Sequence, residues 1–491
     1  MYWLSWIYAI ALLGMSVFGL NLWLMTVVAV VLRLPWPKRW RQTPPPTLAE
    51  GEWPTVLIQL PLYNERYVVE RVIDAVVALD YPLDRLTIQV LDDSTDDTAA
   101  IARSRVAFHR ARGHAINYLH RTNRSGYKAG ALAAGLQVSS AEFVAIFDAD
   151  FVPATDFLRR TIPEFYRDPR IAIVESRWEH LNHDQDPFTQ GIALQLDSYF
   201  GVQQAASSRM SLLMNFNGSG GVWRRSAIDD AGGWSGDTLA EDLDLSYRAQ
   251  LRGWRLIYLG DLASPAELPT TMVAFKRQQF RWAKGSVQVL RKVNSNLVTA
   301  RISLFRKLQG YLHLSGYLGH SLVVVSLLLS LPVVLLNHGQ TPMRWEVLQL
   351  AGFAPPVMAI TAQLFLHKDW YKRLPYYPLW ILVGVGLALT NLVAVWDAFL
   401  GTSNVFERTP KTPPGSQDAK SYGLPLDWTT WGETFLAFYA FVTGMLATDL
   451  ARGLAPVIFL YALGFGYTAA LGFLQADALG QSKTARQTQT N

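Results

Sequence analysis

The sequence predicts a chain in two parts, a water-soluble α/β domain and an α-helical membrane domain. No charged residue occurs from Met1 to Leu32. Further uncharged stretches follow in the second half of the chain, at about Tyr311–Leu336, Leu348–Leu366, Leu379–Trp396, Phe435–Thr448 and Leu454–Leu474. The block between the first uncharged stretch and the later ones, from Arg33 to about Gly310, alternates short apolar strands with helical patterns. It is large enough to fold as a domain of its own.

The first segment, residues 1–33, is predicted to be a transmembrane anchor. As a helix it is long enough to cross roughly 30 Å of hydrocarbon. It is too long for a signal-peptide core and has no basic leader, so we expect it to be retained. The basic residues Arg33, Lys38, Arg39 and Arg41 resist translocation, which places the soluble block in the cytosol, at the inner or plasma membrane of the cell.

Composition narrows the possible partners. The chain has 491 residues, is 50% hydrophobic and contains 17 Trp, which is more apolar and aromatic than an ordinary soluble protein. The absence of cysteine excludes disulfides, thiol nucleophiles and cysteine-ligated metal centres. The net charge of +5 is diffuse and does not indicate nucleic acid binding. We expect anionic lipid head groups and a negatively charged substrate as partners.

Three predicted strands of the soluble block each run straight into a polar cluster. Val56–Leu60 leads into PLYNE, and a helix follows at Val68–Leu79. Thr87–Leu91 leads into DDSTDDT, and Glu142–Phe147 leads into Asp148–Asp150. In a doubly wound parallel sheet the carboxyl ends of the strands meet at one crevice, so we expect these clusters to converge. The first strand is followed by no Gly-x-Gly-x-x-Gly turn and the chain has no phosphate-binding Gly-Lys-Ser/Thr loop, so the crevice must hold its ligand in another way.

The aspartates of these clusters are candidate metal ligands. Asp148 and Asp150 offer hard oxygen ligands to a Mg²⁺ or Mn²⁺ ion that bridges a diphosphate. Alternatively, they cap the helix or turn at Pro153. Asp92 and Asp93 on the neighbouring strand favour the metal, because four carboxylates at one sheet edge repel each other unless a cation or a hydrogen-bonding ligand offsets them.

Two later segments carry further candidates. Lys128 lies in SGYKAGALAAG at a predicted helix start, where it could meet a phosphate or could be a solvated surface lysine. Thr238 and Glu241 form a capping-box pattern at the start of another helix. That pattern explains Glu241 but not Asp242, which we expect to face the crevice and act as general base toward a hydroxyl.

The stretch QQFRWAKG, Gln278–Gly285, combines amides, cations and an indole shortly before the membrane half. Arg281 could offer a bidentate fork to a diphosphate, and Trp282 a flat face on which a sugar ring stacks. The surrounding residues 271–308 interleave basic and apolar side chains and predict helices in the membrane interface. The alternative is that Arg281 and Trp282 only anchor the chain at the bilayer.

Together these motifs resemble the inverting family 2 glycosyltransferases of the membrane-embedded, processive branch, which includes cellulose, hyaluronan and chitin synthases. The branch has a spaced Asp, an Asp-x-Asp, a Glu-Asp or Asp-Asp, and a Gln-x-x-Arg-Trp, matched here by Asp92/Asp93, Asp148–Asp150, Glu241-Asp242 and Gln278–Trp282. The stretches FNGSGGVWRRSAIDDAGGW and AEDLDLSYRAQLRGW most resemble plant cellulose-synthase-like enzymes that make mannan or xyloglucan-backbone glucan. Ala240 stands where the family usually has Thr or Val, beside intact acids.

The resemblance implies a GT-A fold for residues 34–270 and a role for each motif. The residues that would hold the nucleotide sugar are Tyr63, Glu65, Asp92, Asp93, Lys128, Asp148, Gln278 and Arg281. Asp148 and Asp150 would bind Mg²⁺ or Mn²⁺, and Asp242 would be the catalytic base. Glu241 and Trp282 would contact the acceptor.

The resemblance also implies an activity. It points to a processive β-glycosyltransferase that polymerises hexose from UDP-glucose or GDP-mannose, with inversion, into a polysaccharide exported across the membrane. An alternative is an enzyme that adds one hexose to a membrane lipid, as ceramide glucosyltransferases do. The alternative outside the enzyme class is an inactive transporter or scaffold. The presence of an acid at every acidic position of the motifs argues against it.

The membrane half is predicted to occupy residues 309–475, followed by a disordered tail at 476–491. Leu379–Trp396 carries Asn391 and is closed by Asp397, so we expect a kinked interfacial or re-entrant helix that does not cross. This leaves five crossings and places the loop Phe406–Pro414, FERTPKTPP, beside the crevice. The resemblance makes that loop a gate over the nucleotide site, and the alternative is an exposed charged linker.

Overall fold

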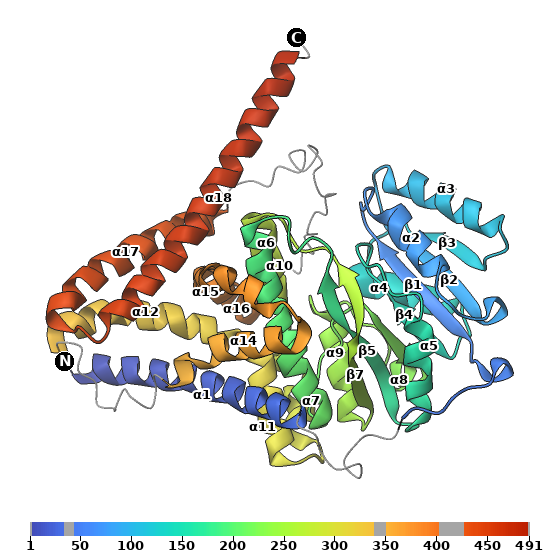
Figure 1. The fold of residues 1–491 in the computed structure, drawn as a ribbon, viewed down its shortest axis with the longest axis horizontal. Coiled ribbons are helices and arrows are strands. Elements are labelled where there is room, and N and C mark those ends of the chain that lie inside the picture. Colours follow the sequence, from blue (N-terminus) through green and yellow to red (C-terminus); the bar gives the residue numbers. More distant parts are fainter. Residues whose placement is uncertain (1, 34–43, 338–349, 402–426, 490–491) are drawn as a thin grey trace.

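The computed structural model describes residues 2–33, 44–337, 350–401 and 427–489. Figure 1 shows two halves, with the strands and the helices that cover them on the right and the long helices of the membrane half on the left. Helix α10 (Met272–Thr299) lies between the halves and is followed by α11 (Leu304–Leu314). These two helices occupy the segment 271–308 that the sequence predicts to be interfacial.

A seven-stranded sheet forms the centre of the soluble half, in the order β3-β2-β1-β4-β6-β5-β7. Its strands are β1 (Val56–Leu62), β2 (Leu86–Asp92), β3 (Ile116–His120), β4 (Phe143–Ile146), β5 (Ile171–His180), β6 (Gly221–Arg224) and β7 (Arg255–Ala266). β6 is antiparallel to β4 and β5, and the other neighbouring pairs are parallel.

The sheet is therefore mixed, whereas the sequence predicts a parallel one. β6 starts at Gly221 beside Ile146, the last residue of β4. Gly218 and Gly220 adopt φ values of +85° and +71°, a conformation that glycine reaches without steric cost, and they turn the chain at this edge. The reversal brings the glycine-rich segment before β6 to the carboxyl end of β4, where the crevice is expected.

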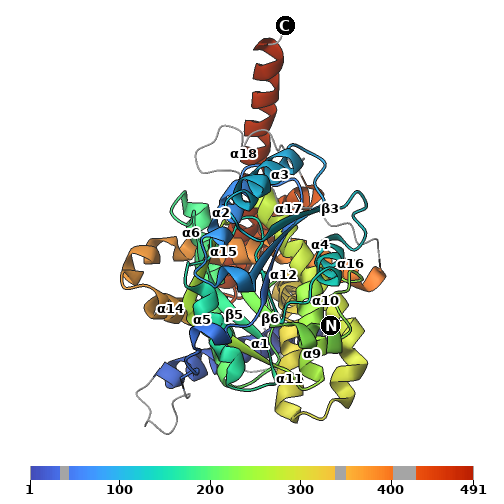
Figure 2. The ribbon, with the colours of Figure 1, turned by 90° about the vertical axis from the view of Figure 1, so that its right-hand side faces the viewer.

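Helices cover both faces of the sheet. One face carries α2 (Val69–Val77), α3 (Thr98–Arg110) and α5 (Phe157–Thr161), and the other carries α4 (Tyr127–Gln137), α8 (Arg225–Asp230) and α9 (Glu241–Leu251). Figure 2 shows α2 and α5 on one side of the strands and α4 and α9 on the other. Alternate residues of β1 supply the two cores, since Ile58 and Leu60 join the first and Leu57 the second.

The membrane half is helical. Its helices are α1 (Tyr2–Arg33), α12 (Leu318–Asn337), α14 (Ala354–Leu366), α15 (Tyr377–Gly386), α16 (Ala388–Leu400), α17 (Trp428–Leu450) and α18 (Ala455–Gln489). Two helices of the soluble half, α6 (Pro187–Ser198) and α7 (Ala205–Arg209), continue into one another through a π-helix at Tyr199–Gln204. α6 packs against α14 and α15, which joins the halves.

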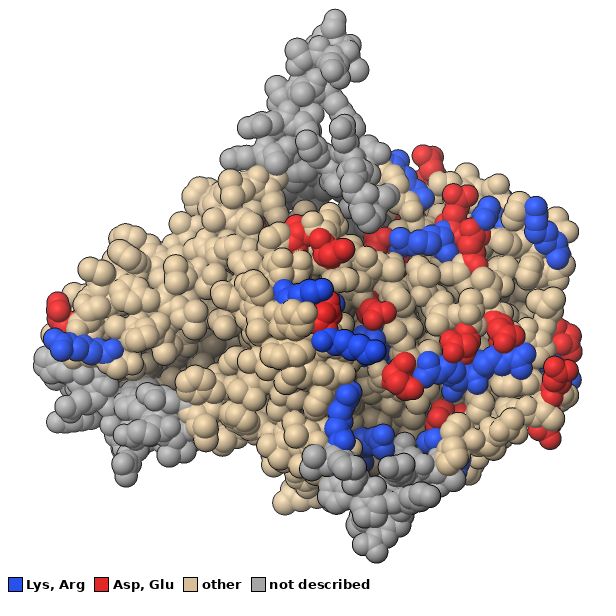
Figure 3. Space-filling model, in the orientation of Figure 1, with Lys and Arg blue, Asp and Glu red and all other residues tan. Residues whose placement is uncertain are grey.

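Four helical stretches among the described residues are long and apolar enough to cross a membrane. They are Trp3–Arg33, Leu318–Leu336, Trp370–Leu400 and Ala455–Ala476. Figure 3 shows charged side chains gathered over the soluble half, while the face formed by the membrane helices is almost free of them. Such a face suits contact with lipid.

The predicted kinked segment Leu379–Trp396 lies inside the stretch Trp370–Leu400. α15 ends at Gly386 and α16 starts at Ala388, so the helix is interrupted as expected. In this stretch 50% of the apolar window is buried inside the protein, against 28–33% in the other three. It therefore packs more deeply among protein groups, and its failure to cross stays a prediction.

Two predictions for this half remain, the disordered tail at 476–491 and the gating loop Phe406–Pro414. α18 continues to Gln489, so residues 476–489 are helical and not the disordered tail that the sequence predicts. These residues contain no proline, three Ala and three Gln residues, which favours propagation of a helix already begun at Ala455. The loop Phe406–Pro414 lies outside the described residues, so its gating role stays a prediction.

Candidate active site

The loops that follow β1 and β2 are tied to each other. The backbone N–H of Asn64 donates to Ser94 Oγ at 2.7 Å, and the backbone N–H of Thr95 donates to Asn64 Oδ1 at 2.8 Å. Asn64 has a φ of +57°, a left-handed conformation that asparagine tolerates better than most residues. Tyr63 and Glu65 flank Asn64, so the first two polar clusters meet as predicted.

Asp92 is fully buried at the end of β2. Its Oδ1 accepts a hydrogen bond from the backbone N–H of Ser94 at 2.9 Å, and its Oδ2 accepts one from the Tyr118 hydroxyl at 2.5 Å. Burial, together with this hydrogen bond, raises the pKa of Tyr118 to about 12. The carboxylate is thus held in place from β3 as well as from its own loop.

Two arginines from the loop before α4 contact other predicted nucleotide ligands. Arg121 forms a bidentate ion pair with Asp93, with Nε 2.7 Å from Oδ1, and donates to the carbonyl oxygen of Tyr127 at 3.0 Å. The Arg124 guanidinium lies 3.3 Å from the centre of the Tyr63 ring. Asp93 therefore orders the start of α4, a part in the site that sequence reasoning did not assign to it.

Lys128 lies at the centre of the site. Its Nζ is 2.6 Å from Asp148 Oδ1, donates to the carbonyl oxygen of Gly218 at 2.9 Å, and is 3.8 Å from Glu241 Oε1. Burial alone would lower the pKa of Lys128, but attraction to Asp148 and then Glu241 outweighs burial and raises it. Only 16% of the side chain is exposed, which excludes a solvated surface lysine.

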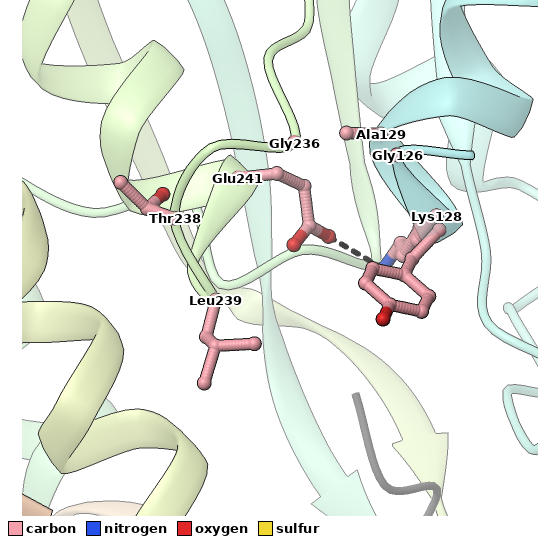
Figure 4. Close-up of a pocket in the computed structure, with 8 residues that line it drawn as sticks. Gly126, Lys128, Ala129, Gly236, Thr238, Leu239 and Glu241 are labelled. Atoms are coloured by element: carbon pink, nitrogen blue, oxygen red, sulfur yellow. Dashed lines mark ion pairs between the residues drawn. The ribbon is translucent and has the colours of Figure 1, made fainter. Parts of the chain in front are cut away.

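A small pocket lies beside this ion pair. Its lining residues are Gly126, Tyr127, Lys128, Ala129, Gly236, Thr238, Leu239 and Glu241. Figure 4 shows the Glu241 carboxylate and the Lys128 ammonium pointing toward each other across it. A Cβ on Gly236 would lie 2.7 Å from the Cα of Gly126, so two glycines let the segment before α9 reach α4.

The start of α9 differs from the predicted capping box. The N-cap is Ala240, and no side chain caps the helix there. Instead, Glu241 faces Lys128, and Asp242 Oδ1 accepts a hydrogen bond from the backbone N–H of Leu243 at 2.7 Å. The Glu241 carboxylate is thus directed to the Lys128 ammonium, and a charge-assisted contact of this kind replaces the predicted hydrogen bond to the helix start.

Asp242 has the properties of a general base. Burial, and then the charge of Glu241, raise the pKa of Asp242 to about 7, although Lys128 opposes the shift. A Cβ on Gly218 would lie 2.7 Å from Asp242 Oδ2 and 3.2 Å from Lys128 Nζ, so only glycine fits between the base and the ammonium. A carboxylate with a pKa near neutrality is suited to removing a proton from a hydroxyl.

The predicted metal ligands form an open set. Asp148 lies beside Lys128, and Asp150 Oδ2 accepts a hydrogen bond from the backbone N–H of Glu267 at 3.1 Å. Within the described residues, no three Asp, Glu, His or Cys side chains form a complete metal site. Two carboxylates at the end of β4 fit a Mg²⁺ or Mn²⁺ ion that takes its remaining ligands from water and a diphosphate.

Helix α10 packs closely against the segment before α9 at Gly285. A Cβ on Gly285 would lie 2.7 Å from the Cβ of Ala240 and 3.0 Å from its backbone nitrogen. The backbone N–H of Leu239 donates to Gln288 Oε1 at 2.9 Å. The absence of a side chain at Gly285 therefore lets the QQFRW helix pack directly on the segment that leads to Asp242.

The charge of Arg281 on α10 reaches the carboxylates around Lys128. Burial lowers the pKa of Arg281, while Glu241, Asp148 and Asp242 are close enough to oppose that shift. Gln278 lies one helical turn earlier, and its Oε1 is buried without a hydrogen-bond partner among the described groups. Trp282 is half-buried on the same helix.

Two buried ion pairs fix α10 to the membrane half. Lys276 Nζ is 2.6 Å from Glu433 Oε2 on α17, and Lys284 Nζ is 2.7 Å from Asp397 Oδ2 on α16. The two lysines lie on either side of Arg281 in the sequence. The membrane half therefore sets the register of the QQFRW segment, although sequence reasoning predicted only an interfacial helix.

Glu175 on β5 is a site residue that sequence reasoning missed. Its Oε1 accepts hydrogen bonds from the backbone N–H and the Nδ2 of Asn217, at 2.8 and 2.9 Å, and its Oε2 accepts one from Gln204 Nε2 at 2.8 Å. Burial raises the pKa of Glu175 to about 8. It anchors Asn217, the neighbour of Gly218, and a lone acid inside the apolar run IAIVESRW was the available signal.

Comparison with known proteins gives the same assignment. The model of a family described as glycosyltransferase like family 2 matches residues 54–285. Glucomannan 4-beta-mannosyltransferase 9 of Arabidopsis thaliana is 35% identical over 382 residues, which cover 76% of this chain and 70% of that protein. Glucomannan 4-beta-mannosyltransferase 1 of Oryza sativa subsp. japonica is 44% identical over 54% of this chain, a match that spans about half of the rice protein, 51%.

A solved structure shares the fold. A mannosyltransferase from Pyrobaculum calidifontis, in complex with GDP-Man and Mn²⁺, superposes with a TM-score of 0.54 at 21% identity, covering 82% of this chain and 99% of the other. The soluble half therefore has the GT-A fold that the resemblance implies. Asp148 and Glu241, from two of the motifs, flank the Lys128 ammonium, and the chain belongs to the family 2 glycosyltransferases.

Proposed function

We propose that the chain transfers hexose from a nucleotide sugar to a glycan acceptor with inversion, and that GDP-mannose is its donor. The observation that carries this proposal is the convergence of Lys128, Asp148, Asp242 and Arg281 beside the carboxyl end of β4. The names of the plant relatives, glucomannan 4-beta-mannosyltransferases, favour the mannosyl donor. UDP-glucose is the second candidate donor.

The geometry suggests a role for each group. Asp242 takes the proton of an acceptor hydroxyl as its oxygen attacks the anomeric carbon, and the bond from that carbon to the diphosphate breaks. Lys128 and Arg281 stabilise the negative charge that develops on the leaving diphosphate. Asp148 and Asp150 would hold a divalent cation, which supplies further neutralisation of that diphosphate when bound. No covalent intermediate is needed.

The remaining predicted contacts complete the proposal. Asp92 and the loop around Tyr63 and Glu65 hold the nucleotide. Glu241 and Trp282 contact the acceptor, at the point where α10 meets the membrane half. We propose that the product is a chain that leaves through the membrane half, with the soluble half in the cytosol. The competing activity is a single transfer to a membrane lipid.

The test uses the full chain reconstituted in lipid nanodiscs with Mg²⁺ or Mn²⁺. Labelled GDP-mannose and UDP-glucose are supplied separately, and the products are separated by size and analysed for linkage. We expect a mannose-containing polymer. If the product is a lipid carrying one sugar, the activity is a single transfer and not polymer synthesis. If neither donor supports transfer, the proposal is overturned.

The role of the base has a matched control. Asp242→Asn should bind GDP-mannose nearly as tightly as the wild type and lose transfer. Asp229→Asn changes an aspartate whose side chain is 62% exposed on α8, and it should retain transfer. Comparable turnover in Asp242→Asn would remove Asp242 from this role.

A further inference from the structure

A second cavity lies away from the candidate active site, where the end of α1 meets the soluble half. It has a volume of about 630 Å³, within the range of about 300–1,000 Å³ usual for ligand pockets. Its walls come from the last turn of α1, the end of α14, helix α7, the β7 segment Ile257–Asp261 and the short helix Ile162–Tyr166. None of the predicted nucleotide or metal ligands lines it.

The cavity is strongly basic. Five arginines line it, namely Arg33, Arg159, Arg160, Arg167 and Arg209. The acids in the lining are Glu164 and Asp261, so the wall has a net charge of three positive. Arg167 pairs with Glu164 at 3.0 Å and Arg160 with Asp261 at 2.6 Å, while Arg159 pairs with Asp80, outside the lining, at 3.2 Å. Within the described residues, Arg33 and Arg209 pair with no carboxylate.

The cavity also has an apolar wall on the membrane side. Arg33 is the last residue of a stretch apolar enough to cross a membrane, and its guanidinium lies 4.1 Å from the centre of the Phe365 ring near the end of α14. Ala29 and Leu32 of the same α1 turn line the wall. Figure 3 shows basic side chains gathered beside this end of α1, at the border of the uncharged face. An arginine at the end of a membrane-spanning helix is suited to contact lipid phosphates.

We propose that this cavity binds the head group of an anionic phospholipid, with its phosphate on Arg33, Arg159 and Arg209 and its acyl chains along α1 and α14. Arginine provides paired donors that match phosphate oxygens. A soluble phosphate would use only the basic wall, whereas a ligand with a hydrocarbon part would also use the apolar wall formed by Leu32 and Phe365.

The experiment measures lipid retention on the full chain. The protein is purified from nanodiscs that contain equal amounts of phosphatidylglycerol and phosphatidylcholine, and lipids that remain bound are identified by native mass spectrometry. The wild type should retain phosphatidylglycerol in several-fold excess. Arg209→Gln should lower that excess, and Arg159→Gln/Arg209→Gln should abolish it. Arg209 is exposed and Arg159 is half-buried, and unchanged thermal unfolding will show that the variants fold.

Two further arms decide the identity of the ligand. Arg112→Gln removes an exposed arginine after α3, far from α1, and should leave the preference unchanged. Inorganic phosphate at millimolar concentration should not displace the retained lipid. The proposal would be overturned if the wild type retained both lipids equally, or if Arg112→Gln lowered the phosphatidylglycerol excess as much as Arg209→Gln does. Displacement of the retained lipid by phosphate would also overturn it.

Discussion

Gly285→Ala tests whether sugar transfer requires the close packing of α10, the helix that carries QQFRW, against the start of α9. The new Cβ would lie 2.7 Å from the Cβ of Ala240 and 3.2 Å from the carbonyl carbon of Leu239, where ordinary contacts are 3.4–4 Å. One helix must therefore move by about 1 Å. Overpacking of this kind costs about 1–3 kcal/mol, and the gain of alanine over glycine inside a helix offsets about 1 kcal/mol.

The stability change is thus small, whereas the effect on turnover is large. A shift of about 1 Å between Arg281 and Asp242 is expected to lower the transfer rate about 100-fold. The assay measures kcat for sugar transfer, binding of the nucleotide sugar and thermal unfolding. Gly384→Ala is the matched control, because it lies in helix α15 and no atom is within 4 Å of its added Cβ. Wild-type turnover in Gly285→Ala would refute the reasoning.

Three further predictions concern protonation, the missed anchor and the coupling to the membrane half. Because the pKa of Asp242 is raised to about 7 and its deprotonated form is the base, kcat/KM should fall as pH drops below about 7, and a flat profile from pH 5 to 8 would contradict this. Glu175→Ala should cost about 1–3 kcal/mol of unfolding free energy, measured by denaturant titration, since it leaves the donors of Asn217 unpaired, while Glu175→Gln should cost less. Lys276→Met should destabilise the protein by about 3–5 kcal/mol by leaving Glu433 buried without its partner, and Lys276→Met/Glu433→Leu should recover most of that loss in the same measurement.

The elements of the fold could be read from local patterns. The helix α1 follows from a run without charge, because a membrane-spanning helix needs only enough consecutive apolar residues. The strands β1, β2 and β4 follow from short apolar runs that end in polar clusters, since the ligand crevice lies at the ends of buried strands. The direction of β6 could not be read in the same way, because strand pairing is set by the partner and not by the strand itself.

The candidate site was predicted in its chemistry but not in its contacts. The motifs gave Lys128, Asp148, Glu241 and Asp242, which the structure brings together. The capping pattern at Thr238 was misread, because the sequence does not show that Lys128 lies near Glu241. A local rule fails where a distant charge offers a stronger partner.

The sequence by itself determined which segments are helices, which strands carry acids at their ends, and which residue types are available for transfer chemistry. These depend on periodicity and on side-chain chemistry, both of which are local. The tertiary structure alone decided how far the acids lie from each other and what holds them there. Lys276 and Glu433 are 157 residues apart in the chain, and Glu175 and Asn217 are 42 apart. Such pairs exist only after folding has brought their segments together, because burial is what makes each charged or polar group require its partner.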